Sequence, residues 1–113
     1  MIQVYHNARC SKSRECLAIL EKSGQDFEIV KYLENVPALE ELTEIVRKLQ
    51  LKPIELVRQK EKIWIENFKD KKLSDDEILK IMISNPILIE RPIVINGEKA
   101  IIARPMEKIA TLL

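Results

Sequence analysis

Residues 4–20 of the chain read VYHNARCSKSRECLAIL. A short apolar strand ends in a histidine and an asparagine, Cys10 follows, and apolar residues at helical spacing begin directly after it. The pattern predicts a strand over residues 2–5 and a helix over residues 11–23, with Gly24 placed to end the helix. The chain therefore places a thiol where a strand gives way to a helix.

The rest of the chain carries weaker but consistent patterns. Alternation over residues 26–33 predicts a second strand, and an Asn96-Gly97 turn between two apolar runs predicts a hairpin. Pro105 is placed to open a last helix. Between the second strand and the hairpin, helices are expected over residues 37–49, 53–59, 60–68 and 73–83, the last with Ser74 and Glu77 spaced as a capping box.

The order βαβ, helical insert, ββα predicts an α/β fold. A parallel strand pair followed by an antiparallel hairpin gives a mixed four-stranded sheet covered by helices. The chain has 113 residues, which is long enough for one domain with its own core. We expect a single domain over residues 1–113, with the helical insert at about residues 37–84.

Composition excludes several classes of protein. A net charge of +1 provides no strong field for nucleic acid or an anionic membrane surface. No apolar run approaches the ~20 residues of a membrane span, and the N-terminus lacks the pattern of a signal peptide. One histidine and two cysteines without ligand spacing argue against a metal site. We therefore expect a cytoplasmic protein with no nucleic acid, membrane or metal partner.

Cys10 has the surroundings of a reactive thiol. A cysteine at a helix start lies near unsatisfied N–H groups and the positive end of the helix dipole, which stabilise a thiolate and can also bind an oxyanion. Nearby cations lower the pKa of the thiol further, and those available are His6, Arg9, Lys12 and Arg14. A buried, inert cysteine is the alternative, but these polar and cationic flanks favour a reactive one.

Cys16 has the opposite character. It falls in the apolar stripe of the predicted helix, six residues after Cys10, which is an axial rise of ~9 Å. A disulfide needs Cα atoms roughly 4.4–6.8 Å apart, so the two cysteines cannot pair in an intact helix. Position 13 is Ser13, so the chain has no C-x-x-C motif. We therefore expect Cys16 in the core and a reducing partner outside the protein.

Five segments together resemble the glutaredoxin-coupled arsenate reductase (ArsC) family, in order and at similar spacing. They are YHNARCSKSR (5–14), YLENVP (32–37), LVRQK (56–60), NPILIERPIV (85–94) and ARP (103–105). The resemblance covers essentially the whole chain. It implies a thioredoxin-like fold with a helical insert between the second and third strands, in agreement with the predicted element order.

Position by position, the resemblance implies a site around Cys10. Cys10 matches the family's nucleophile, and His6 and Ser13 match catalytic positions flanking its thiolate. Ala8 departs from the family pattern, which usually has proline there, and this change should loosen the turn before Cys10 without removing a reacting group.

The resemblance also implies three oxyanion-binding arginines: Arg58, Arg91 and Arg104. Their planar forks of donors suit a tetrahedral oxyanion. Surface ion pairs are the alternative for each of them. Pro92 matches the proline before the third strand, which is expected to be cis beside the active cysteine.

The resemblance implies an arsenate reductase that takes electrons from glutathione, as co-substrate, and glutaredoxin. No tightly bound cofactor and a monomeric state are expected. Two alternatives stay open: a glutathione-dependent thiol-disulfide oxidoreductase, and an Spx-like transcription regulator that binds RNA polymerase. The presence of all three arginines and the absence of a second motif cysteine favour the reductase.

Overall fold

The computed structural model describes residues 1–113. The chain forms two compact units. The first combines Met1–Asn35 with Arg91–Leu113, and the second is Val36–Glu90. The predicted helical insert, at about residues 37–84, falls within the second unit.

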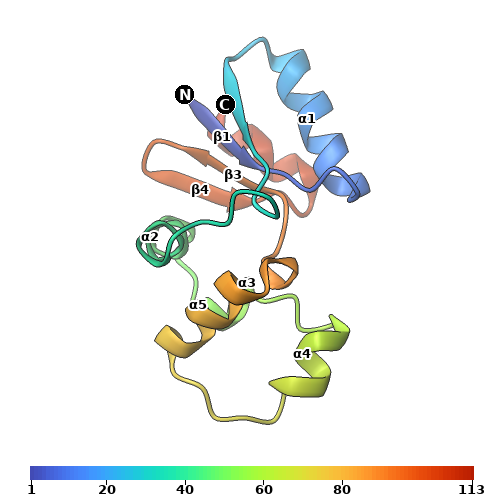
Figure 1. Ribbon diagram of the computed structural model, residues 1–113. Coiled ribbons are helices and arrows are strands. Elements are labelled where there is room, and N and C mark those ends of the chain that lie inside the picture. Colours follow the sequence, from blue (N-terminus) through green and yellow to red (C-terminus); the bar gives the residue numbers. More distant parts are fainter. The chain divides into compact units, whose positions relative to one another are not determined.

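The first unit contains a mixed four-stranded sheet in the order β2-β1-β3-β4 (Figure 1). β1 pairs parallel with β2 and antiparallel with β3, and β3 and β4 form an antiparallel hairpin. Gly97 supplies the positive φ (63°) of the hairpin turn. The predicted α/β class and sheet are confirmed, with strands β1 (Ile2–Tyr5), β2 (Phe27–Val30), β3 (Ile93–Asn96) and β4 (Lys99–Ile102).

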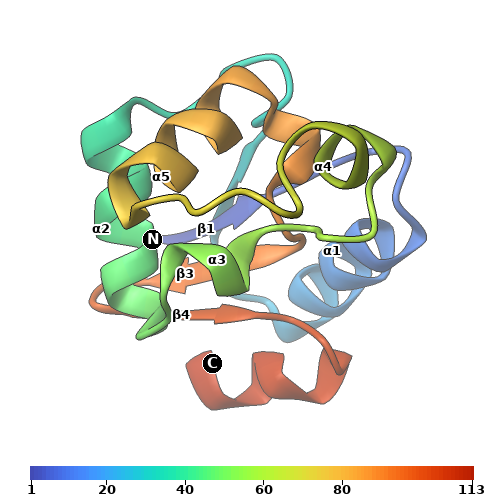
Figure 2. The ribbon, with the colours of Figure 1, turned by 90° about the horizontal axis from the view of Figure 1, so that it is seen from below.

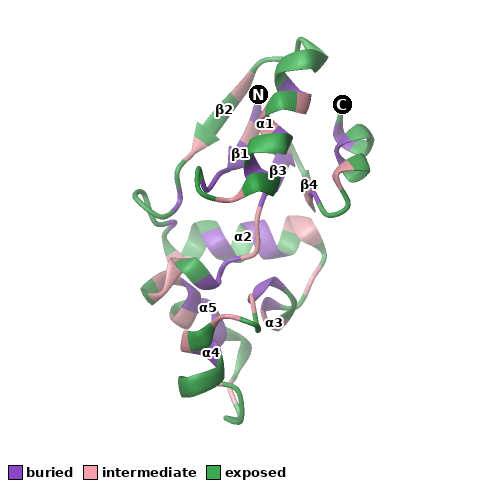
Figure 3. Ribbon diagram, turned by 90° about the vertical axis from the view of Figure 1, so that its right-hand side faces the viewer, coloured by how far each residue is buried: buried purple, intermediate pink, exposed green.

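The second strand is shorter than the predicted 26–33. The carbonyl of Lys31 accepts hydrogen bonds from the backbone N–H groups of Glu34 (3.0 Å) and Asn35 (2.8 Å), and these close a turn directly after β2. β2 lies at the sheet edge and is largely exposed, whereas β3 is buried along most of its length (Figure 3).

Two helices cover one face of this sheet. α1 (Ser11–Ser23) and the C-terminal 3-10 helix η2 (Met106–Leu112) pack together and against the strands (Figure 2). α1 has the predicted bounds, and Gly24 ends it at φ 76°. The last helix is present but is 3-10 throughout. One hydrophobic core cluster of the unit consists of Ile2, Val4, Cys16, Leu20, Val94, Ala103, Ile109 and Leu112.

The second unit is helical. The capping box at Ser74 is confirmed: its Oγ accepts from Glu77 N–H at 3.1 Å, and its own N–H donates to the Glu77 carboxylate at 3.2 Å. The short helix η1 was not predicted. The elements are α2 (Leu39–Leu49), α3 (Pro53–Leu56), α4 (Lys62–Asn67), α5 (Asp75–Ser84) and η1 (Pro86–Leu88). None of the helices in the molecule combines the length and apolar character needed to cross a membrane.

Candidate active site

Cys10 is the N-cap residue of α1. Its backbone is extended (φ −93°, ψ 122°), and its carbonyl accepts the first helical hydrogen bond, from Arg14 N–H at 3.2 Å. The first turn of α1 contains no acidic residue. The predicted position of the thiol at the helix start is therefore confirmed, and the local backbone dipoles favour a negative charge there.

Hydrogen bonds stabilise the thiolate form of Cys10. Burial raises the pKa of the thiol, but the backbone N–H of Ser13, the side chain of Arg91 and the backbone N–H of Lys12 outweigh burial and lower the pKa to about 7. About half of Cys10 is therefore thiolate at pH 7. This balance favours the thiolate, which is the nucleophilic form of a cysteine, at neutral pH.

Two arginines reach Cys10 from distant parts of the sequence. The Nη2 of Arg104 lies 3.6 Å from the Cys10 sulfur, and the Nε of Arg104 donates to the main-chain oxygen of Arg91 at 2.7 Å. Arg91 lies just before β3 and Arg104 just after β4, so the hairpin brings both to the start of α1. The Arg91–Pro92 peptide bond is cis, as the resemblance implies, and Pro92 is buried.

His6 and Ser13 lie in the segments that flank the thiol. His6 is 6% exposed, and its Nδ1 has no hydrogen-bond partner. Burial, with the charges of Lys31 and Arg14, lowers the pKa of His6 against an opposing backbone hydrogen bond at Ser13, which favours the neutral imidazole. The buried Ser13 accepts a hydrogen bond on Oγ from Asn7 N–H at 3.4 Å.

Arg58 belongs to the second unit, where it follows α3. Its backbone N–H donates to Leu88 O at 2.7 Å. Its Nη2 lies 3.7 Å from the Glu61 carboxylate, while its Nη1 is buried without a hydrogen-bond partner. A buried guanidinium donor of this kind is costly to leave unpaired and is suited to an anionic ligand.

Cys16 lies in the core of the first unit, as predicted. It is 0% exposed, and burial raises the pKa of its thiol to about 11. Both cysteines are free. Only Cys10 therefore has an ionisable, accessible sulfur at neutral pH.

Sequence reasoning missed Asn7 as a residue of this site. Asn7 is 6% exposed, and its Oδ1 accepts from Arg9 N–H at 3.0 Å, within the turn that leads to Cys10. The available signal was its position three residues before the cysteine, because asparagine is favoured at the first position of a β-turn.

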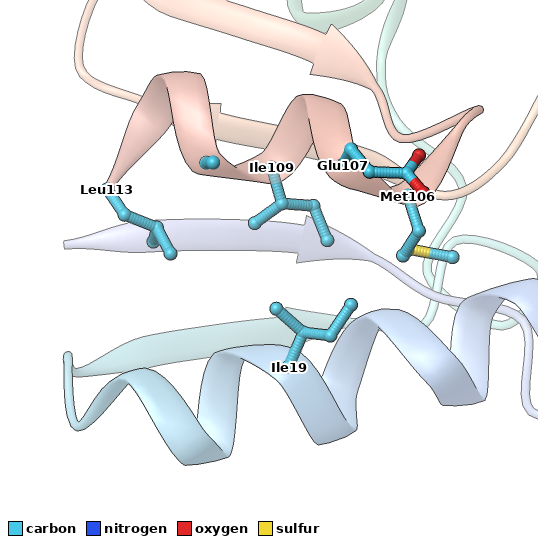
Figure 4. Close-up of a pocket in the computed structure, with 6 residues that line it drawn as sticks. Ile19, Met106, Glu107, Ile109 and Leu113 are labelled. Atoms are coloured by element: carbon cyan, nitrogen blue, oxygen red, sulfur yellow. The ribbon is translucent and has the colours of Figure 1, made fainter.

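A separate cavity of about 220 Å³ lies between α1 and η2 (Figure 4). None of the predicted site residues lines it. The lining residues are Ile19, Met106, Glu107, Ile109, Ala110 and Leu113. The cavity is therefore distinct from the surroundings of the Cys10 thiol.

Known proteins resemble this chain throughout its length. The model of the ArsC family matches residues 5–112. An arsenate reductase of Neisseria meningitidis serogroup A is 40% identical over 114 residues, which cover 99% of this chain and 97% of the relative. The "Uncharacterized protein YfgD" of Escherichia coli K12 is 42% identical over 110 residues, covering 96% and 92%.

A comparison with solved structures also finds similarity over nearly the whole chain. The arsenate reductase from Vibrio cholerae superposes with a TM-score of 0.94 at 42% identity, covering 99% of this chain and 97% of its own. Its mixed sheet and helices correspond to the architecture described above. The chain belongs to the ArsC family and has its thioredoxin-like fold.

Proposed function

We propose that the protein is an arsenate reductase in which Cys10 is the single catalytic cysteine. One observation carries the proposal: Arg104 Nη2 lies 3.6 Å from the Cys10 sulfur, beside the Arg91 side chain that also hydrogen-bonds this thiol. A nucleophile and two guanidinium groups thus converge at the start of a helix. Relatives named arsenate reductase, at 40% and 41% identity, support the choice of substrate.

The oxyanion is held by donors that match its charge. Arg91 and Arg104 provide planar forks of N–H groups, and the positive end of the α1 dipole also favours an anion there. Arg58 is proposed as a third arsenate-binding residue. That role rests on the sequence resemblance and on the unpaired Nη1 of Arg58.

The first chemical step joins sulfur to arsenic. The Cys10 thiolate attacks the arsenic atom of arsenate, one arsenate oxygen takes up protons and leaves as water, and a Cys10–S–As(V) adduct remains. The arginines offset the negative charge on the remaining oxygens during this step. His6, which is buried and has a lowered pKa, and Ser13, whose N–H bonds the sulfur, are proposed to assist.

The second step reduces the arsenic. The glutathione thiolate attacks the Cys10 sulfur, and the electron pair of the S–As bond goes to arsenic, which falls from +5 to +3 and leaves as arsenite. A mixed disulfide between Cys10 and glutathione remains. Glutaredoxin attacks the glutathione sulfur and releases the Cys10 thiolate, which the low pKa makes a good leaving group.

An external reductant is required because Cys16 cannot resolve the mixed disulfide. It is 0% exposed, and its pKa of about 11 leaves almost no thiolate at pH 7. The electrons come from thiols, so the proposed cycle uses glutathione as co-substrate and no tightly bound cofactor.

A coupled assay tests the proposal. NADPH oxidation is followed with glutathione, glutaredoxin and glutathione reductase, with and without arsenate. Arsenate-dependent oxidation that disappears in Cys10→Ser supports the reductase. Equal rates with and without arsenate, together with reduction of a glutathione mixed disulfide, would instead identify a thiol-disulfide oxidoreductase.

A further inference from the structure

The segment that leads to Cys10 is a double turn. Cys10 N–H donates to Asn7 O at 3.0 Å, which closes a β-turn with Ala8 and Arg9 at its central positions. The side-chain Oδ1 of Asn7 accepts from Arg9 N–H at 3.0 Å, which adds an Asx-turn inside the first. Asn7 itself is tied to α1, because its N–H donates to Ser13 Oγ.

A second tie comes from the helix. Arg14, in the first turn of α1, sends its Nη1 back to the carbonyl of Ala8 at 3.1 Å. The backbone N–H of the same residue donates to Cys10 O at 3.2 Å. Arg14 therefore bonds Ala8 in the turn through its side chain and the N-cap residue Cys10 through its backbone.

We propose that Arg14 and Asn7 are positioning residues that lock the Asn7–Cys10 turn and so hold the sulfur of Cys10 against the first backbone N–H groups of α1. The locking is needed because Ala8 has neither a ring nor a branched side chain to restrict its backbone. The inference rests on the proposed role of Cys10 as the reactive thiol, but not on arsenate being the substrate.

Fixing the turn through Arg14 and Asn7 should affect the pKa of the Cys10 thiol. The hydrogen bonds from Ser13 N–H and Lys12 N–H lower the pKa of the thiol only while Cys10 stays at the N-cap. A turn that opens part of the time would lose these bonds part of the time. The apparent pKa would then rise from about 7 toward the ~8.5 of an ordinary thiol.

The effect of the Arg14 charge on the pKa of Cys10 must be separated from the effect of its hydrogen bond to the turn. The charged and titratable groups on the segments around the thiol are His6 from the segment after β1, Arg9 from the turn, Lys12 and Arg14 from α1, and Arg91 and Arg104 from the ends of the hairpin strands. Removing Arg14 removes one of these charges as well as the tie to Ala8. Arg9→Ala is the matched control, since it removes a positive charge from the turn itself and keeps the hydrogen bond from the Arg9 backbone N–H to Asn7 Oδ1.

The experiment measures the pH dependence of Cys10 alkylation by iodoacetamide in the full chain, with peptide mapping, in Arg14→Ala, Asn7→Ala, Arg9→Ala and the parent. Circular dichroism and the melting temperature check folding. We expect the alkylation midpoint of Arg14→Ala and Asn7→Ala to rise by about half a pH unit or more, and to rise further than in Arg9→Ala.

A rescue variant gives the decisive comparison. Ala8 occupies the first central position of the β-turn, where proline is favoured because its ring fixes φ. Adding Ala8→Pro to Arg14→Ala should return the midpoint to the Arg9→Ala value, because the proline restores the turn but not the charge. Equal midpoints in Arg14→Ala and Arg9→Ala, or no return with Ala8→Pro, would overturn the inference and leave Arg14 as a charge only. Neither readout uses arsenate, so a failure here is distinct from a failure of the reductase assay.

Discussion

Arg104 holds the Cys10 sulfur and the main chain of Arg91 at the same time. Its Nη2 lies 3.6 Å from the sulfur, and its Nε donates to the Arg91 carbonyl at 2.7 Å. Arg104 and Cys10 are separated by 94 positions in the sequence. One planar side chain thus links the helix that bears the thiol to the segment that begins β3.

Replacing either arginine should weaken arsenate binding more than it weakens the fold. Arg91→Ala and Arg104→Ala should raise the KM for arsenate at least about tenfold, because each removes a charge-assisted pair of hydrogen bonds, with a small change in melting temperature. Steady-state kinetics and thermal melts check this. A large drop in melting temperature with an unchanged KM would make the arginines structural ion-pair partners.

Lysine should rescue Arg104 only in part. Lysine supplies the charge but has no Nε in the position that donates to the Arg91 carbonyl. Arg104→Lys should therefore give a KM between those of the parent and Arg104→Ala. Full recovery would show that charge alone is sufficient at this position.

The two cysteines should differ sharply in reactivity. At about pH 7, roughly half of Cys10 is thiolate, whereas the pKa of about 11 leaves about one Cys16 in ten thousand ionised. Brief alkylation and peptide mapping should find label on Cys10 alone in the folded protein. Label on Cys16 at comparable rates would reverse the assignment of the nucleophile.

Cys16→Ser should retain the catalytic cycle and lose stability. The new hydroxyl enters an apolar core position that is 0% exposed, which costs about 1–3 kcal/mol of unfolding free energy. Urea denaturation measures the loss, and Cys16→Ala is the matched control without a polar group. Loss of turnover in a folded Cys16→Ser protein would reveal an internal dithiol cycle.

His6 should make stability depend on pH below neutrality. Its pKa in the folded protein lies below the 6.5 of an unfolded histidine, so the unfolded chain binds the proton first as pH falls. The contribution of His6 is complete above about pH 6.5 and is lost progressively as pH falls toward the folded pKa. Urea titrations between about pH 7 and pH 5 should show this decline, and His6→Gln should flatten it.

Local sequence patterns predicted the elements well. The bounds of α1, the Gly24 terminus and the Ser74 capping box each depend on neighbouring residues, so a short window contains all the information they need. β2 ended early because the carbonyl of Lys31 closes a turn with Glu34 and Asn35. The sequence predicted a helix after Pro105, but it did not predict that this helix has 3-10 rather than α geometry.

Local sequence patterns could not predict the contacts between segments that lie far apart in the chain. The resemblance placed Arg91 and Arg104 near Cys10, but their mutual hydrogen bond depends on how the hairpin ends meet α1. The hydrogen bond from the Arg14 side chain to the Ala8 carbonyl depends on a side-chain rotamer, which hydrophobic periodicity cannot predict. Cys10 at a helix start could be predicted because one local boundary determines it.

The arsenate-dependent rate of NADPH oxidation by the full chain, with glutathione, glutaredoxin and glutathione reductase, measures the proposed reductase activity itself. Turnover should require arsenate and all three of these components, should fall to background in Cys10→Ser, and should persist in a folded Cys16→Ala. A protein that is folded and labels at Cys10, yet reduces no arsenate with either glutaredoxin or thioredoxin, would contradict the proposed function.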